Sequence, residues 1–99
     1  PGDLARARPM LDTACTAGVP EACAILGEDY GEGRGVPADQ SRAAVLYDKA
    51  CGGGFPPACT NLGYQVETGD GVTKDLARAR TLYEKACGPT SACCTGGTN

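Results

Sequence analysis

Seven cysteines and no histidine make sulfur the main reactive chemistry that this 99-residue sequence offers. Such a density indicates disulfides in an oxidising compartment or thiolates that hold a metal. Two cysteine pairs, Cys15 with Cys23 and Cys51 with Cys59, each enclose seven residues. A fifth cysteine, Cys87, follows Cys51 at the same interval that separates Cys51 from Cys15. A metal site would use short Cys-x-x-Cys pairs or histidines, and the sequence has neither. The spacing therefore favours disulfides, and we expect no metal and no cofactor.

The hydroxyl and thiol nucleophiles lack the neighbours that catalysis requires. A serine enzyme of the β-lactamase type needs Ser-x-x-Lys, but Ser41 is followed three residues later by Ala44, and Ser91 by Cys94. A cysteine left over from disulfide pairing would have no histidine to activate it. We therefore expect no catalytic residue.

The charge and hydropathy pattern argue against two classes of partner. The formal net charge is −3, whereas nucleic-acid binding needs a clustered excess of Lys and Arg. No apolar run reaches the roughly 18 residues that a membrane-spanning helix requires. We expect neither a nucleic-acid partner nor a membrane span.

The segments that position the cysteines repeat every 36 residues. Residues 3–8 return unchanged at residues 75–80, and Cys15, Cys51 and Cys87 each follow an alanine at this period. A period of this length is typical of solenoids, in which each unit buries its apolar face against its neighbours.

Each repeat contains two helical patterns joined by a Gly-x-Gly turn, where glycines with positive φ are expected. The first pattern begins at or near a proline, which the first turn of a helix tolerates. The second has apolar residues at i, i+3, i+4 and i+7, as at Ala43, Leu46, Tyr47 and Ala50. The predicted helices lie near residues 3–15, 20–32, 38–51, 57–68 and 74–87.

Two recurrent features of these helices have structural interpretations. Gly27, like its equivalent Gly63, lies inside a first helix, where glycine costs about 1 kcal/mol relative to alanine; we expect it to let the second helix approach beside Ala43. Each second helix begins with an Asp–Arg pair such as Asp39 and Arg42. The pairs could form a charged ladder for a partner's carboxylates, but a favourable interaction with the helix N-terminus is the simpler interpretation.

The repeat motif resembles that of a known family. Each unit reads Pro-x-Ala-Cys-x-x-Leu-Gly, then Gly-x-Gly-Val, then Asp-x-x-Arg-Ala, and finally Leu-Tyr-(Asp/Glu)-Lys-Ala-Cys. This order is similar to the Sel-one-like repeat, a relative of the tetratricopeptide repeat. The cysteines resemble those of the subset typified by the Helicobacter cysteine-rich proteins. In the first copy, Met10 and Leu11 replace the Leu-Tyr pair.

Together, the period and the resemblance predict an all-α, right-handed α/α solenoid of 36-residue helix-turn-helix repeats, stapled by disulfides. We expect one repeat domain over residues 1–99. Residues 1–17 would supply the second helix of a preceding repeat, residues 18–53 and 54–88 two repeats, and residues 89–99 a truncated repeat start and tail. The chain is expected to be part of a longer array.

The resemblance also implies that each disulfide closes a corner between consecutive repeats. The predicted pairs are Cys15–Cys23, Cys51–Cys59 and Cys87–Cys93, with Cys94 as the substitute for Cys93. Such disulfides imply an extracytoplasmic location, periplasmic or secreted.

Fold-level analogy predicts a non-enzymatic scaffold that binds another protein or peptide. Partner contacts are expected where aligned repeats differ in character, at the pairs Glu28/Tyr64, Tyr30/Val66, Arg34/Asp70 and Gln40/Leu76. The resemblance to the cysteine-rich subset also implies an alternative, β-lactamase or penicillin-binding activity, which a nitrocefin assay on the oxidised protein would test. A structural spacer is the second alternative.

Overall fold

A computed structural model describes the backbone of residues 2–87 and the side chains of residues 9–87. Within this range the chain forms five α-helices and no strand, as the sequence predicts. The helices are α1 (Gly2–Thr16), α2 (Pro20–Glu32), α3 (Gln40–Gly52), α4 (Pro56–Thr68) and α5 (Leu76–Cys87). None of these helices has the length and apolar character needed to cross a membrane.

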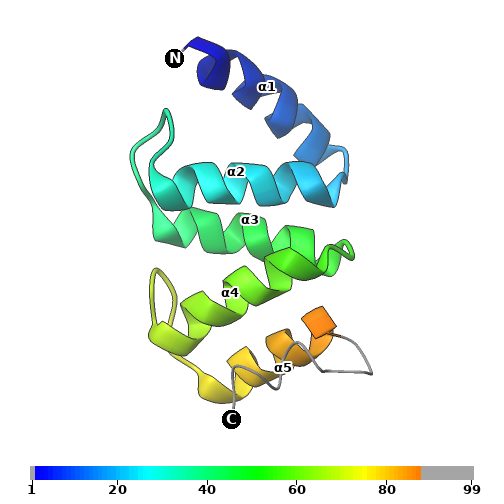
Figure 1. Cartoon of the computed structure of the whole chain (residues 1–99), viewed down its shortest axis with the longest axis vertical. Helices are drawn as coiled ribbons and strands as arrows, with labels where there is room; N and C mark the ends of the chain where they lie inside the picture. Colours follow the sequence, from blue (N-terminus) through cyan, green and yellow to red (C-terminus); the bar gives the residue numbers. More distant parts are fainter. Residues whose placement is uncertain (1, 88–99) are drawn as a thin grey trace.

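The helices stack in chain order along the longest axis of the molecule, from α1 at one end to α5 at the other (Figure 1). Contacts are most extensive between α2 and α3 and between α4 and α5, the two helices of each repeat. Smaller interfaces join α1 to α2 and α3 to α4. This arrangement of helix pairs stacked on their neighbours is the predicted α-solenoid.

Helices α3 and α5 begin two residues later than the sequence pattern suggests, because an aspartate caps each of them. The Asp39 carboxylate accepts a hydrogen bond from the backbone N–H of Arg42 at 3.1 Å, and that of Asp75 accepts one from Arg78 at 3.0 Å. Caps of this kind stabilise a helix by about 1 kcal/mol. The two described aspartates therefore cap their own helices, which supports the structural interpretation of these residues. The Arg42 and Arg78 side chains contact other helices, at Tyr30 and Asp48.

The core is built mainly from small side chains. Ala43, Ala50 and Ala58 are fully buried, and Leu26 and Leu62 are the largest side chains at the centre. The predicted apolar face of α3 joins this cluster, with Leu46 partly exposed at its edge. Small side chains let the helices approach closely, but each buries little apolar area, so hydrophobic burial per residue is modest.

The glycines inside the first helices have a different neighbour from the one that the sequence suggested. A Cβ atom on Gly27 would lie 2.7 Å from the Tyr47 ring, and one on Gly63 would lie 2.8 Å from the Tyr83 ring. These glycines therefore make room for an aromatic ring of the second helix, and the expectation of a close approach beside Ala43 was wrong. The need for space can be inferred from sequence, but the side chain that fills it depends on how the two helices pack.

Disulfides join consecutive helices at two corners of the solenoid. The sulfur atoms are 2.10 Å apart in Cys15–Cys23, between α1 and α2, and 2.02 Å apart in Cys51–Cys59, between α3 and α4. Cys87 is also disulfide-bonded. The two cysteines predicted as its partner, Cys93 and Cys94, lie outside the described residues.

Candidate binding site between helices α2 and α4

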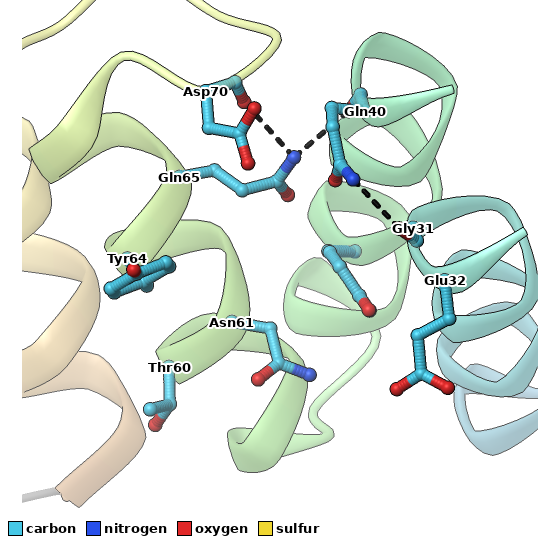
Figure 2. A pocket seen from close by; sticks show the side chains of 9 residues that line it. Gly31, Glu32, Gln40, Thr60, Asn61, Tyr64, Gln65 and Asp70 are labelled. Carbon is cyan, nitrogen blue, oxygen red and sulfur yellow. Dashed lines mark hydrogen bonds between the residues drawn. The ribbon is translucent and has the colours of Figure 1, made fainter. Parts of the chain in front are cut away.

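A pocket of about 410 Å³ lies where α2, α3 and α4 meet (Figure 2). This volume is within the range of pockets that hold small ligands or side chains of a partner. We call it the α2–α4 pocket, and its lining residues come from the three helices and from the loop after α4. They are Gly31, Glu32, Gln40, Tyr47, Thr60, Asn61, Tyr64, Gln65 and Asp70.

Gln65 is the most buried polar residue of this pocket, with a relative exposure of 4%. Its side-chain nitrogen donates hydrogen bonds to the backbone carbonyls of Gln40 at 2.8 Å and Asp70 at 3.2 Å. Gln40 in turn donates a side-chain hydrogen bond to the Gly31 carbonyl at 2.7 Å. This chain of contacts ties the start of α3 to both α2 and the loop after α4, and so holds the pocket wall in place.

The tyrosines of the two repeats differ in their hydroxyl environment. Tyr83 donates a hydrogen bond to the Glu67 carboxylate at 2.7 Å. The position equivalent to Glu67 in the preceding repeat is Gly31, which has no side chain to accept a bond from Tyr47. The first repeat therefore opens space beside the Tyr47 ring, and this space forms part of the pocket.

Burial raises the pKa of Tyr47 to about 12, and the nearby carboxylates of Glu28, Glu32 and Asp29 add to the effect. Both causes disfavour the phenolate, the first by loss of hydration and the others by repulsion between like charges. The environment of Tyr47 is therefore negative as well as buried.

We expect the stability of the fold to decrease as the pH rises from about 10, the ordinary pKa of tyrosine, to about 12, the pKa of folded Tyr47. Below this window Tyr47 is protonated in both states, so its contribution is constant. Within the window the unfolded chain loses the proton and the folded chain keeps it, which favours unfolding. Urea unfolding at successive pH values measures the decrease.

A Tyr47→Phe variant is the control for this prediction. It should lose part of the pH dependence, while Tyr83, whose pKa is also raised to about 12 by burial and by its hydrogen bond to Glu67, keeps the remainder. An unchanged pH profile in the variant would contradict the assignment to Tyr47.

The α2–α4 pocket is acidic at its rim. Glu32 and Asp70 line it and are exposed, and no Lys or Arg is among its described lining residues. Arg34, outside the lining, lies 2.7 Å from the Glu32 carboxylate in an exposed ion pair, which contributes little to stability. In the described part of the chain, no group of three or more Cys, Asp or Glu side chains is placed to hold a metal ion.

The structure brings together three of the residues predicted to contact a partner. Tyr64, Gln40 and Asp70 all line the pocket, and the Tyr64 side chain is 61% exposed. Glu28 lies close enough to Tyr47 to raise its pKa but does not line the pocket.

The other predicted contact residues lie elsewhere. The half-buried Tyr30 ring is covered by the Arg42 guanidinium, 4.8 Å from its centroid, and Arg34 lies on the loop after α2. Val66 is fully buried in the core and therefore cannot present its side chain to a partner. Leu76 is exposed at the first position of α5, away from the pocket lining.

Asn61, Gln65 and Gly31 were missed by the sequence reasoning, although the same criterion could have found them. Their equivalents in the other repeat are Ile25, Asp29 and Glu67, so each pair differs in character. The remaining missed lining residues are Glu32, Tyr47 and Thr60. What the aligned repeats cannot show is which differing positions face the same pocket.

Comparison with known proteins agrees with this architecture. The Sel1 repeat family model matches residues 20–55 and 56–87. The chain is 34% identical to a Sel1 repeat protein from Oxalobacter formigenes, with a TM-score of 0.78 over 83% of this chain and 34% of that one. It is 33% identical to Helicobacter pylori cysteine rich protein B, with a TM-score of 0.83 over 90% of this chain and 69% of that one.

A third similar structure is c5321, a protective antigen of uropathogenic Escherichia coli strains that displays an SLR fold. It is 35% identical, with a TM-score of 0.75 over 78% of this chain and 16% of that one. The chain thus spans about a third of the length of the Oxalobacter protein. A comparison with curated proteins gave no match. The two consecutive matches to the family model together cover more than half of this chain, which therefore belongs to the Sel1 repeat family.

Proposed function

We propose that this chain is a polypeptide-binding module of an exported Sel1 repeat protein, and that the α2–α4 pocket is its main contact site. Sel1 repeats generally serve as scaffolds for protein–protein interactions, and stacked helix pairs provide an extended surface for such contacts. The observation that carries the proposal is the position of Tyr64, largely exposed on α4 and next to the polar side chains of the pocket.

The chemistry of the lining supports a polypeptide partner. An exposed tyrosine supplies rigid contact area and a polar end, and tyrosines are frequent among the residues that dominate binding energy at protein interfaces. Asn61 and Gln40 add amide groups that can donate and accept hydrogen bonds, as the backbone of a bound peptide requires. The disulfides support export, because such bonds persist in oxidising compartments.

We expect peptides selected from a displayed random library on the oxidised protein to bind through Tyr64. Tyr64→Ala should weaken their binding about tenfold or more, because it removes the largest exposed contact of the pocket. Val45→Ala is the matched control, since Val45 is similarly exposed but lies outside the pocket lining. Calorimetry on the two variants measures the difference.

If the selected peptides bind the wild type and the Tyr64→Ala variant with equal affinity, the α2–α4 pocket is not their contact site. If selection repeatedly yields no specific peptide, the proposed function itself fails.

A further inference from the structure

The buried oxygen of Gln65 is an acceptor without a donor. Gln65 Oε1 accepts no hydrogen bond from any of the described residues. The amide orientation is set by its surroundings, because a reversed amide would direct its oxygen at the Gln40 and Asp70 carbonyl oxygens. In Figure 2 the Gln65 nitrogen faces these two carbonyls, and its oxygen lies on the opposite side of the amide, toward the other lining side chains. An unsatisfied buried acceptor favours a ligand that supplies an N–H group.

The charges around this oxygen specify the ligand further. The Glu32 and Asp70 carboxylates line the same pocket, and the Glu28 and Asp29 carboxylates act on the Tyr47 hydroxyl from nearby. The described lining residues include no Lys or Arg, and Arg34, which pairs with Glu32, lies outside the lining. A cationic donor is therefore favoured over a neutral or acidic one.

The exposed Tyr64 ring adds a preference among cations. A guanidinium group is planar, stacks on aromatic faces, and carries five N–H donors in a fixed fork. An ammonium group is a compact, strongly hydrated charge with three donors. A guanidinium can therefore present a flat face to the Tyr64 ring while its edge donates to an acceptor such as the Gln65 oxygen, which an ammonium group cannot do.

We propose that the α2–α4 pocket binds an arginine side chain of the partner polypeptide. This inference rests on the proposed function and names the chemistry of its partner. Gln65 Oε1 accepts from the guanidinium at the floor of the pocket, Glu32 and Asp70 balance its charge, and the Tyr64 ring stacks on it. The ion pair between Arg34 and Glu32 shows that one of these carboxylates already accepts a guanidinium from within the chain.

The test is an NMR titration of the oxidised full chain with three capped tripeptides of sequence Gly-X-Gly, in which X is arginine, citrulline or lysine. Citrulline has nearly the shape of arginine without its charge. We expect the arginine peptide to shift the side-chain amide signals of Gln65 and Asn61, and to bind about tenfold more tightly than the citrulline peptide. Lysine should bind with intermediate affinity.

Two charge-matched variants separate pocket binding from general attraction. Glu32→Gln with Asp70→Asn should weaken the arginine peptide about tenfold. Glu21→Gln with Glu84→Gln removes the same charge from exposed residues outside the lining and should leave the affinity within about twofold. Arg34→Gln should tighten binding, because it removes the competing guanidinium from Glu32.

Several results would overturn the arginine proposal while leaving the protein-binding function in place. The first is that the arginine peptide binds no more tightly than the citrulline or the lysine peptide. The second is that both double variants lose the same affinity for the arginine peptide. The third is that display-selected peptides bind through Tyr64 but contain no arginine. If neither the selected peptides nor the arginine peptide shifts the NMR signals of the pocket residues, both the arginine proposal and the proposed polypeptide-binding function are wrong.

Discussion

Reduction of the disulfides is expected to lower the free energy of unfolding by about 2.5 kcal/mol for each corner bridge. The Cys15–Cys23 and Cys51–Cys59 bridges together account for about 5 kcal/mol, and the bridge at Cys87 adds to this. The first two bridges each span a sequence separation of 8, so each closes a loop of nine residues. Closing a loop of this length removes conformational entropy from the unfolded chain, which stabilises the folded state.

The effect should be large relative to the total stability of the domain. Small domains are stable by roughly 5–15 kcal/mol, and this core is built mainly from alanine, leucine and cysteine side chains. We therefore expect the reduced protein to be largely unfolded under conditions in which the oxidised protein is folded. Urea unfolding of both forms, followed by circular dichroism, measures the difference.

A variant with Cys51→Ala and Cys59→Ala tests the corner between α3 and α4 alone. It should lose about 2.5 kcal/mol of stability, plus a smaller amount for the buried sulfur atoms that alanine does not replace. Matching unfolding curves for the reduced and oxidised wild type would show that the bridges do not hold this fold together.

Gly71→Ala is expected to destabilise the fold by about 2–5 kcal/mol, the largest effect that we predict for a single substitution. Gly71 has a φ of +79°, which costs an L-residue about 1–2 kcal/mol. Its new Cβ atom would also lie 2.5 Å from the backbone carbon of Gln40 and 2.7 Å from the backbone nitrogen of Ser41. Overpacking of this kind adds about 1–3 kcal/mol.

The clash cannot be relieved by a side-chain rotation, because the neighbouring atoms include the backbone at the start of α3. The Ser41 hydroxyl also donates a hydrogen bond to the Gly71 carbonyl at 2.9 Å, so the loop after α4 is held against α3. Relief would require the second repeat to move away from the first, which would disturb the interface of α3 with α4 and the nearby α2–α4 pocket.

Gly54→Ala is the matched control for Gly71→Ala. Gly54 also has a positive φ, +98°, but a Cβ atom there would meet no atom within 4 Å. This variant should lose only the conformational part, about 1–2 kcal/mol. If the two substitutions reduce the urea midpoint equally, the close approach of Gly71 to α3 contributes nothing to stability.

Much of the fold could be predicted from local sequence. The apolar spacing around Ala43 and Tyr47, the prolines that open α2 and α4, and the glycines that end them are local signals, and each describes its own helix. The period of 36 residues then places successive helix pairs in one stack, because equal units bury equal faces. For the same reason the cysteines at 15, 23, 51 and 59 could be assigned to corners.

The candidate site was determined mainly by tertiary structure. Val66 and Tyr64 are two residues apart on α4, yet one is fully buried and the other largely exposed. Gln65 connects α4 to the start of α3, although Gln40 lies in the preceding repeat.

The sequence by itself therefore determined the helices, their period and the corners at which sulfur could join them, since these depend on residues close together in the chain. Only the tertiary structure decided which rings fill the space beside Gly27 and Gly63, and which polar groups share a pocket. The physical reason is that both depend on the rotation and separation of packed helices, which are set by side chains from more than one repeat.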